Sequence, residues 1–267
     1  MPTVNSEILR ILKDKDRMIK SGVQSVLDLL EEVRSQVIKE IGAAAVTEWD
    51  AYHLKEVLNS IESQIENFKV RAKIEAEKNL QAAWEKGQVL VDGPLSVGGI
   101  YPGFGISTSV LETLKDFTFH KIEGLSNAAW DKIQGELTLG VMGGKTPQEV
   151  AAAIGKNLEV PSVFGSIANR AEVITKTEMG RVFSTAAELR MEEAGKYVDG
   201  LEKQWRHAGH PAVPRPSHLI ADGQHVPVDE PFNIGGVLMM HPRDPAAPIE
   251  EVINCGCDHV PYHDRWS

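Results

Sequence analysis

The segment IKSGVQSVLDLLEEVRSQVIKEI, residues 19–41, decides the fold class, because its apolar residues recur at alternating intervals of four and three. These seam residues are Ile19, Val23, Val26, Leu30, Val33 and Val37. The pattern predicts a long helix over residues 5–41 with one apolar seam, and residues 54–72 repeat the rhythm. Because neither helix can bury its seam alone, we expect a helical hairpin over residues 1–88.

The apolar seam allows two interpretations. In the first, the hairpin is part of a helical bundle that closes on itself within one chain. In the second, the seam packs on another subunit, so that the protein forms a homo-oligomer through its N-terminal helices. Heptad-like spacing does not identify the partner of a seam, although the closed bundle is the simpler interpretation.

A segment rich in glycine and proline, residues 87–107, interrupts the helical pattern. We therefore predict a connector over residues 89–107. Helices are expected beyond it at residues 109–121, 126–138 and 164–195. Between the last two, Thr146, Pro147 and Glu149 have the order of a helical N-cap with a capping box.

The character of the sequence changes after Tyr197, where nine of the fourteen prolines and seven of the nine histidines occur. Short apolar runs there are bounded by turn residues, which is typical of short strands. The fold class predicted for the chain is therefore mainly α with a C-terminal α+β module. The predicted domain over residues 108–267 has a helical part, 108–196, and a small irregular sheet within 197–267.

The charge balance disfavours broad binding to nucleic acid, because 38 acidic and 28 basic residues give a net charge of -10. One local exception could give weak contact with DNA. It comprises Lys69, Arg71, Lys73 and Lys78 on the second long helix, where Glu75 and Glu77 dilute the positive charge. No apolar run is long enough for a membrane span, and the two cysteines without a secretory signal indicate a reducing cytoplasm.

An ordered set of elements within residues 110–262 resembles the phage Mu F-like family of minor head, or head morphogenesis, proteins. The elements are a Thr-Glu pair (Thr177, Glu178), a strand with Trp205, Arg215 with His218, Phe232, a turn from Pro242 to Pro245, and Cys255 with Cys257. The family often has arginine between the two cysteines, whereas this chain has Gly256.

The resemblance implies a structural component of a tailed-phage or prophage head, present in few copies and acting in head assembly. Its expected partners are the portal protein and other head components, with weak contact to packaged DNA. The expected location is the capsid interior or portal vertex of a virion assembled in the host cytoplasm. The N-terminal helices would then be the variable part that binds the partner proteins.

The two cysteines allow three interpretations. Cys255 and Cys257 could bind a structural zinc ion if Gly256 lets the chain turn, with further ligands from His207, His210 or His218. They could instead pack as small apolar side chains beneath Trp205 and Phe232, which is the interpretation we favour. A disulfide is disfavoured, because the ring would be very small and the compartment is reducing.

Two further hypotheses concern polar residues. Glu178 could form a surface ion pair with Arg181 or Arg170, or it could be buried and join its helix to the C-terminal module through Arg206 or Arg215. A metal-dependent nuclease or toxin-like enzyme is the alternative function. Its site would use Arg206, His207, His218, Asp222 and His225. Because their spacing fits no motif with an assigned mechanism, we expect no enzyme and no catalytic residue.

Overall fold

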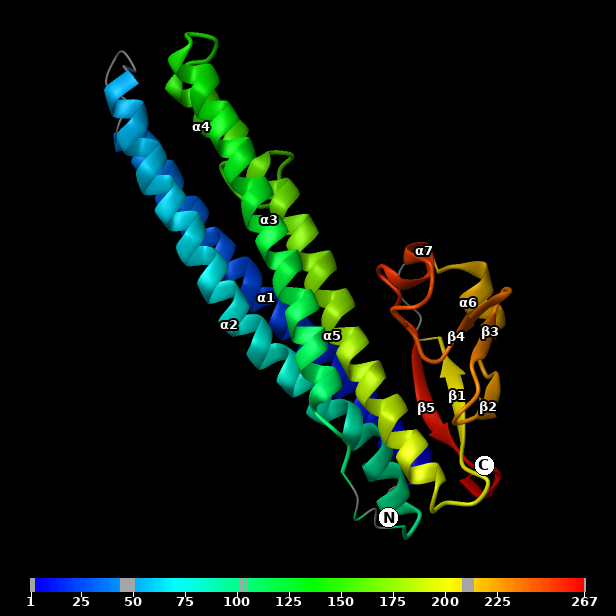
Figure 1. The fold of residues 1–267 in the computed structure, drawn as a ribbon. Coiled ribbons are helices and arrows are strands. Elements are labelled where there is room, and N and C mark those ends of the chain that lie inside the picture. The colour runs from blue at the N-terminus through cyan, green and yellow to red at the C-terminus, as the bar shows by residue number, and fades with distance from the viewer. Residues whose placement is uncertain (1–2, 44–50, 101–102, 104, 208–213, 267) are drawn as a thin grey trace. The chain divides into compact units, whose positions relative to one another are not determined.

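The computed structural model describes residues 3–43, 51–100, 103, 105–207 and 214–266. Five helices lead into the C-terminal strands: α1 (Val4–Ala43), α2 (Ala51–Val97), α3 (Ser109–Val141), α4 (Pro147–Ile154) and α5 (Val163–Gly195) (Figure 1). Of the described residues, 69% are helical, and the C-terminal sheet is small, which confirms the predicted fold class. Among the described helices, none has a stretch long and apolar enough to cross a bilayer.

The chain forms two compact units, each assembled from segments that are distant in sequence. The first unit comprises residues 1–20, 78–115 and 176–267, and the second comprises residues 21–77 and 116–175. The long helices contribute residues to both units, so neither unit corresponds to one continuous stretch of chain.

The apolar seam is buried inside the second unit. Val26, Leu30, Val33 and Val37 of α1 belong to one core cluster with residues of α2, α3, α4 and α5. No seam residue from Val23 to Val37 is more than 8% exposed. The interpretation of a bundle closed within one chain is therefore confirmed, and docking of this seam on another subunit is wrong, because helices of the same chain cover it.

The C-terminal module belongs to the first unit and contains two small antiparallel sheets. One has the order β2-β1-β5, with β1 (Glu202–Arg206), β2 (His225–Pro227) and β5 (Asp258–Tyr262), and pairs Trp205 with His259. The other pairs β3 (Phe232–Ile234) with β4 (Val237–Met239). The short helices are α6 (Pro216–Ile220), α7 (Ile249–Val252) and the 3-10 helix η1 (Asp264–Trp266).

Two expectations about helix ends are wrong. Residues 89–97, predicted as the start of a connector, continue α2 with Pro94 inside the helix. Leu90, Val91 and Leu95 are fully buried there, so packing outweighs the backbone hydrogen bond that proline cannot make. Likewise, α3 runs without interruption where two shorter helices were expected. The proposed domain boundary in this region stays a prediction.

The start of α4 agrees with the prediction. The Thr146 hydroxyl accepts from the Glu149 backbone at 3.2 Å, and the Glu149 carboxylate accepts from the Thr146 backbone at 2.7 Å. Together with a proline at the first helical position, these bonds form the predicted capping box. Thr146 therefore caps the start of a helix in the second unit.

Candidate metal centre

Three metal-ligating side chains meet in the C-terminal module. His218 lies on α6, and Cys255 and Cys257 lie between α7 and β5. One ligand atom from each of the three lies within 4.8 Å of the other two. All three side chains are buried, and both cysteines are free thiols. The structure thus brings together three of the five residues considered as zinc ligands.

The His218 ring is oriented by a carboxylate. Its Nδ1 lies 3.5 Å from the Cys255 sulfur and 3.4 Å from the Cys257 sulfur. Its Nε2 lies 2.7 Å from Oε2 of Glu251 on α7. Arg215, the N-cap residue of α6, lies 3.9 Å from the same carboxylate. When Nε2 donates to Glu251, the Nδ1 lone pair points toward the two sulfurs.

Two arginines, the buried Arg243 and the half-buried Arg215, hold the backbone around the cysteines. Arg243 donates to the Cys257 carbonyl at 2.7 and 3.0 Å, and Arg215 donates to the Ile253 carbonyl at 2.7 Å. Asn254 adopts a left-handed conformation with φ 53°, which turns the chain just before Cys255. The approach of the two sulfurs therefore depends on this turn and these anchors, and not on Gly256 alone.

The surroundings of the two thiols shift their pKa values in opposite directions. A hydrogen bond with Cys257 lowers the pKa of Cys255 to about 4 against the effect of burial, and His218 and Arg243 act in the same direction. The same hydrogen bond, together with burial, raises the pKa of Cys257. Burial disfavours the charged His218 ring, but Cys255 and Glu251 outweigh it and raise the pKa of His218. Cys255 is therefore the thiol that loses its proton first.

The other predicted ligands do not join this group. The His207 backbone donates to Asp222 at 2.8 Å, and among the described residues the ligand group does not include His207. His210 lies outside the described residues. His225 is engaged elsewhere, where it pairs with Glu202 and stacks on Tyr262 at 4.6 Å. The polar set considered for an enzyme is thus divided among separate partners.

The packing interpretation of the cysteines also agrees with the structure. Cys255 and Cys257 belong to an apolar cluster with Trp205 and Phe232, both of which are fully buried. The Trp205 ring meets the Phe232 ring edge-on at 5.3 Å and the His218 ring at 5.5 Å. This aromatic cover keeps water away from the thiols and the imidazole.

The Thr-Glu pair lies inside the protein. Thr177 and Glu178 are 4% and 1% exposed. Glu178 pairs with Arg181 one turn along α5, and Arg181 donates to the Arg243 carbonyl at 3.2 Å. The expected connection from this helix to the C-terminal module therefore runs through Arg181 and Arg243, instead of the proposed Arg206 or Arg215.

A second buried cluster was missed from the sequence. Lys203 of β1 pairs with Glu188 of α5, and His259 Nε2 of β5 lies 2.9 Å from the same carboxylate. Lys15 of α1 pairs with Asp258 at 2.5 Å, 243 positions away. Lys203 and Trp205 are two positions apart and share the buried face of β1. Strand periodicity could therefore have identified Lys203 as a buried lysine.

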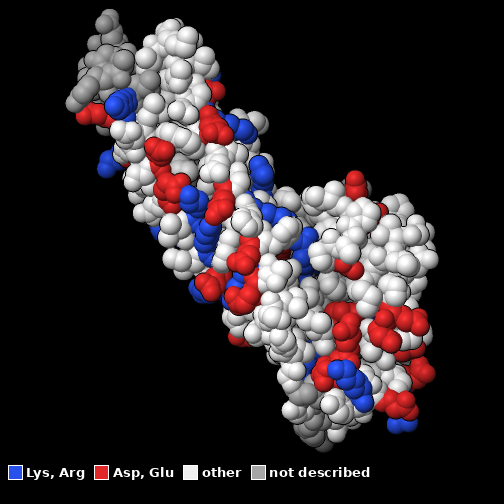
Figure 2. Space-filling model, viewed as in Figure 1, with Lys and Arg blue, Asp and Glu red and all other residues white. Residues whose placement is uncertain are grey.

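Three of the four basic residues considered for DNA contact pair with neighbouring carboxylates. Lys69 pairs with Glu66 and Lys73 with Glu123, while Arg71 donates to both oxygens of Glu32 at 2.8 and 2.7 Å. Lys78 also has an interaction partner. Figure 2 shows basic and acidic side chains interspersed on the visible face of the helices. This arrangement does not favour a phosphate-binding surface.

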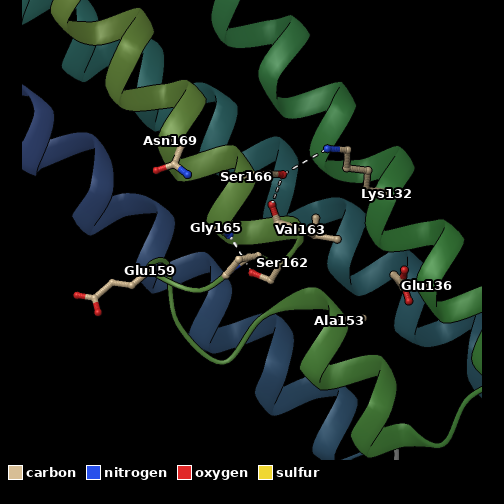
Figure 3. Close-up of a pocket in the computed structure, with 10 residues that line it drawn as sticks. Lys132, Glu136, Ala153, Glu159, Ser162, Val163, Gly165, Ser166 and Asn169 are labelled. Carbon is tan, nitrogen blue, oxygen red and sulfur yellow. Dashed lines mark hydrogen bonds between the residues drawn. The ribbon is translucent and has the colours of Figure 1, made fainter. Parts of the chain in front are cut away.

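A pocket of about 560 Å³ lies in the second unit near the start of α5 (Figure 3). Lys132 reaches across it to the Ser166 hydroxyl at 3.3 Å, and Glu136 pairs with Lys145. Two polar side chains that line the pocket, Lys132 and Glu136, are thus already engaged with other residues. Because they do not converge on a common point, the pocket offers less chemistry than the His218 cluster.

The comparisons with known proteins agree with the resemblance noted from the sequence. Residues 131–260 match the family described as "Phage Mu protein F like protein". A protein of Bacillus subtilis (strain 168) with the name "Uncharacterized protein YqbB" is 26% identical over 187 residues. The match covers 69% of this chain but only 57% of that relative's length. No solved structure matches the chain significantly. Residues 131–260 are thus similar to the phage Mu protein F-like family, as the resemblance noted from the sequence predicted.

Proposed function

We propose that this chain is a minor head protein of a tailed phage or prophage, which acts in head assembly by binding the portal protein and other head components. The observation that carries this proposal is the family match over residues 131–260. The matched segment includes α5, β1, β2 and the first part of β5, and it also contains the His218 cluster. The proposed place of action is the portal vertex or the capsid interior.

Burial of the reactive groups supports binding over catalysis. His218, Cys255 and Cys257 are 2%, 7% and 2% exposed, and the apolar cluster around Trp205 and Phe232 surrounds the cysteines. A nucleic acid or protein substrate would have to reach a general base or metal ion at such a centre directly. These exposures support a structural use of the cluster.

Ion pairing supports proteins as the partners rather than the DNA backbone. The net charge of -10 repels phosphate, and the candidate residues Lys69, Arg71 and Lys73 already pair with carboxylates. Any contact with packaged DNA is therefore expected to be weak and sensitive to salt.

The test is to delete the coding sequence in an inducible phage or prophage and to supply an epitope-tagged chain in trans. We expect fewer functional heads when the chain is absent. The tagged chain should be recovered in purified procapsids, where quantitative mass spectrometry measures its amount relative to the portal protein. A phage enzyme made in the same cells but foreign to the particle serves as the control for contamination. Normal head yield, together with absence of the chain from every particle, would refute the proposal.

The alternative of a metal-dependent nuclease or toxin-like enzyme keeps one supporting observation, namely the Cys2His donor set. Under this alternative, the purified chain with added Zn²⁺ would cleave DNA or RNA, and His218→Ala would abolish the cleavage. Under our proposal, neither the chain nor the variant cleaves either substrate at any metal concentration tested.

A further inference from the structure

We propose that His218, Cys255 and Cys257 bind one thiophilic divalent cation, zinc in the first instance, and that this ion joins α6 to the segment before β5. The site would be an internal cross-link of the C-terminal module. The inference is independent of the role in head assembly, because it concerns side chains of the isolated chain.

The separations of the ligand atoms suit a tetrahedral zinc ion. With Zn–S bonds of about 2.3 Å and Zn–N bonds of about 2.0 Å, tetrahedral angles place sulfur and nitrogen about 3.5 Å apart. The observed separations from His218 Nδ1 are 3.5 Å to Cys255 and 3.4 Å to Cys257. An ion could therefore enter with little movement of the three side chains.

Simple hydrogen bonding explains this arrangement less well. The Nδ1 atom of a neutral imidazole has one lone pair in the ring plane and accepts one S–H donor well. Nevertheless, two sulfurs approach the same nitrogen at nearly equal distances. A cation at the centre of the three atoms accounts for both approaches at once.

Glu251 supplies the outer support that metal-binding histidines usually have. Its carboxylate lies 2.7 Å from Nε2, the nitrogen that faces away from the sulfurs, and Arg215 lies 3.9 Å from the carboxylate. Such a carboxylate fixes the tautomer and the direction of the ring, and its loss typically weakens metal binding about 10–100-fold. Glu251 is therefore proposed as a positioning residue.

Charge and proton balance are satisfied inside the protein. When a divalent ion binds, both sulfurs coordinate as thiolates, the protons that the ligand atoms still carry pass to solvent, and the charges of the metal and the two thiolates cancel. The resulting neutral centre can be buried beside Trp205 and Phe232 at a low cost in solvation. A fourth ligand, either water or another donor, would complete the tetrahedron.

The first experiment uses the reduced, full-length wild-type chain and needs no substitution. After treatment with chelator, we expect Co²⁺ to give the visible absorption of tetrahedral thiolate coordination at one ion per chain. Zn²⁺ should displace the Co²⁺ and slow alkylation of both cysteines. An unchanged alkylation rate with Zn²⁺, or no tetrahedral Co²⁺ spectrum, would overturn the proposal.

The second experiment compares variants by competition with a chromogenic zinc chelator. We expect Cys255→Ser and His218→Gln to lose stoichiometric binding, and Glu251→Gln to bind about 10–100-fold more weakly while it keeps the tetrahedral spectrum. The matched control is His225→Gln, since His225 lies on β2 and is paired with Glu202. Wild-type affinity in Glu251→Gln would remove Glu251 from its positioning role, and wild-type affinity in His218→Gln would refute the site.

Discussion

At the scale of single residues, Lys203 and Glu188 show how strongly the C-terminal module depends on buried charge. Lys203 is fully buried, and its ammonium group donates to the Glu188 carboxylate and, at 2.9 Å, to the Met240 carbonyl. Removal of one partner from a buried pair leaves the other charge without compensation. Such a loss is much more costly than the loss of an exposed ion pair.

We therefore expect Lys203→Met to lower the free energy of unfolding by about 3–5 kcal/mol at pH 8, as measured by urea denaturation. The double variant Lys203→Met with Glu188→Leu should recover most of this loss, because no unpaired charge remains. Lys196→Met is the matched control, since Lys196 pairs with Glu193 at an exposed position, and its effect on the free energy of unfolding should be much smaller. Equal effects of the two lysine substitutions would contradict this interpretation.

The pH dependence of stability should report on Glu188. Burial raises its pKa from 4.5 to about 7 against the influence of Lys203 and His241. Between these two values, the folded chain retains a proton that the unfolded chain has lost. The Glu188 contribution to stability therefore falls as pH rises from about 5 to about 7 and is constant above that range.

The measurement is the difference in unfolding free energy between wild type and Glu188→Gln, determined by urea denaturation at pH 5, 6, 7 and 8. We expect wild type to lose stability relative to the variant as the pH increases. His241, whose pKa burial lowers to about 4, is present in both proteins, so its own titration largely cancels in the difference. A difference that does not change with pH would show that Glu188 is ionised throughout.

The candidate site was only partly predictable at this scale. The clustering of Cys255, Cys257 and His218 followed from residue types that share a chemistry, and the structure places all three together. Glu251 was missed, because a glutamate on a short acidic helix resembles a solvent-exposed residue. Its pairing with His218 depends on how α6 and α7 pack against each other, and a local sequence pattern does not predict that packing.

At the scale of secondary-structure elements, two glycines differ in how closely a neighbouring helix approaches them. Gly87 of α2 is buried, and a Cβ atom there would lie 2.4 Å from the Phe183 carbonyl and 2.8 Å from the Ala186 Cβ of α5. Gly124 of α3 is exposed with open space around it. The same substitution should therefore have opposite effects at the two positions.

Gly87→Ala should lower the free energy of unfolding by about 1–3 kcal/mol, because the helices must separate to admit a methyl group. Gly124→Ala should raise it by up to about 1 kcal/mol, because alanine favours a helix interior. Thermal and urea unfolding monitored by circular dichroism would measure both effects. Stabilisation by Gly87→Ala would mean that α2 and α5 do not approach closely at this point.

The helices themselves were well predicted where an apolar seam recurred, as in α1, and where capping chemistry was local, as at Thr146. Errors arose where local signals conflicted with packing. Gly93 and Pro94 indicated a break, yet the buried Leu90 and Leu95 continue the helix around them. Propensity alone could not reveal this, because the stabilising contacts come from α1, α3 and α5.

At the scale of the whole molecule, the first unit brings together the start, the middle and the end of the chain. Its core includes Val4, Ile8 and Ile11 of α1, Trp84 of α2, and Val260 of β5. Lys15 also supplies the ammonium group that pairs with the buried Asp258. The segment that matches the family, residues 131–260, therefore lacks a large part of the core on which its sheet depends.

The position of the chain break should accordingly decide whether fragments fold. We expect the isolated fragment 116–267 to bind a hydrophobic dye and to lack a near-ultraviolet circular dichroism signal, because it has lost the apolar residues of α1, α2 and the first turns of α3. Fragments 1–106 and 107–267, separated just before α3 and expressed together, should instead associate and regain that signal, since this cut interrupts no described helix. Size-exclusion chromatography of the tagged pair would detect the complex. A cooperative unfolding transition in fragment 116–267 alone would show that the family segment is an independent domain and that the N-terminal contacts are dispensable.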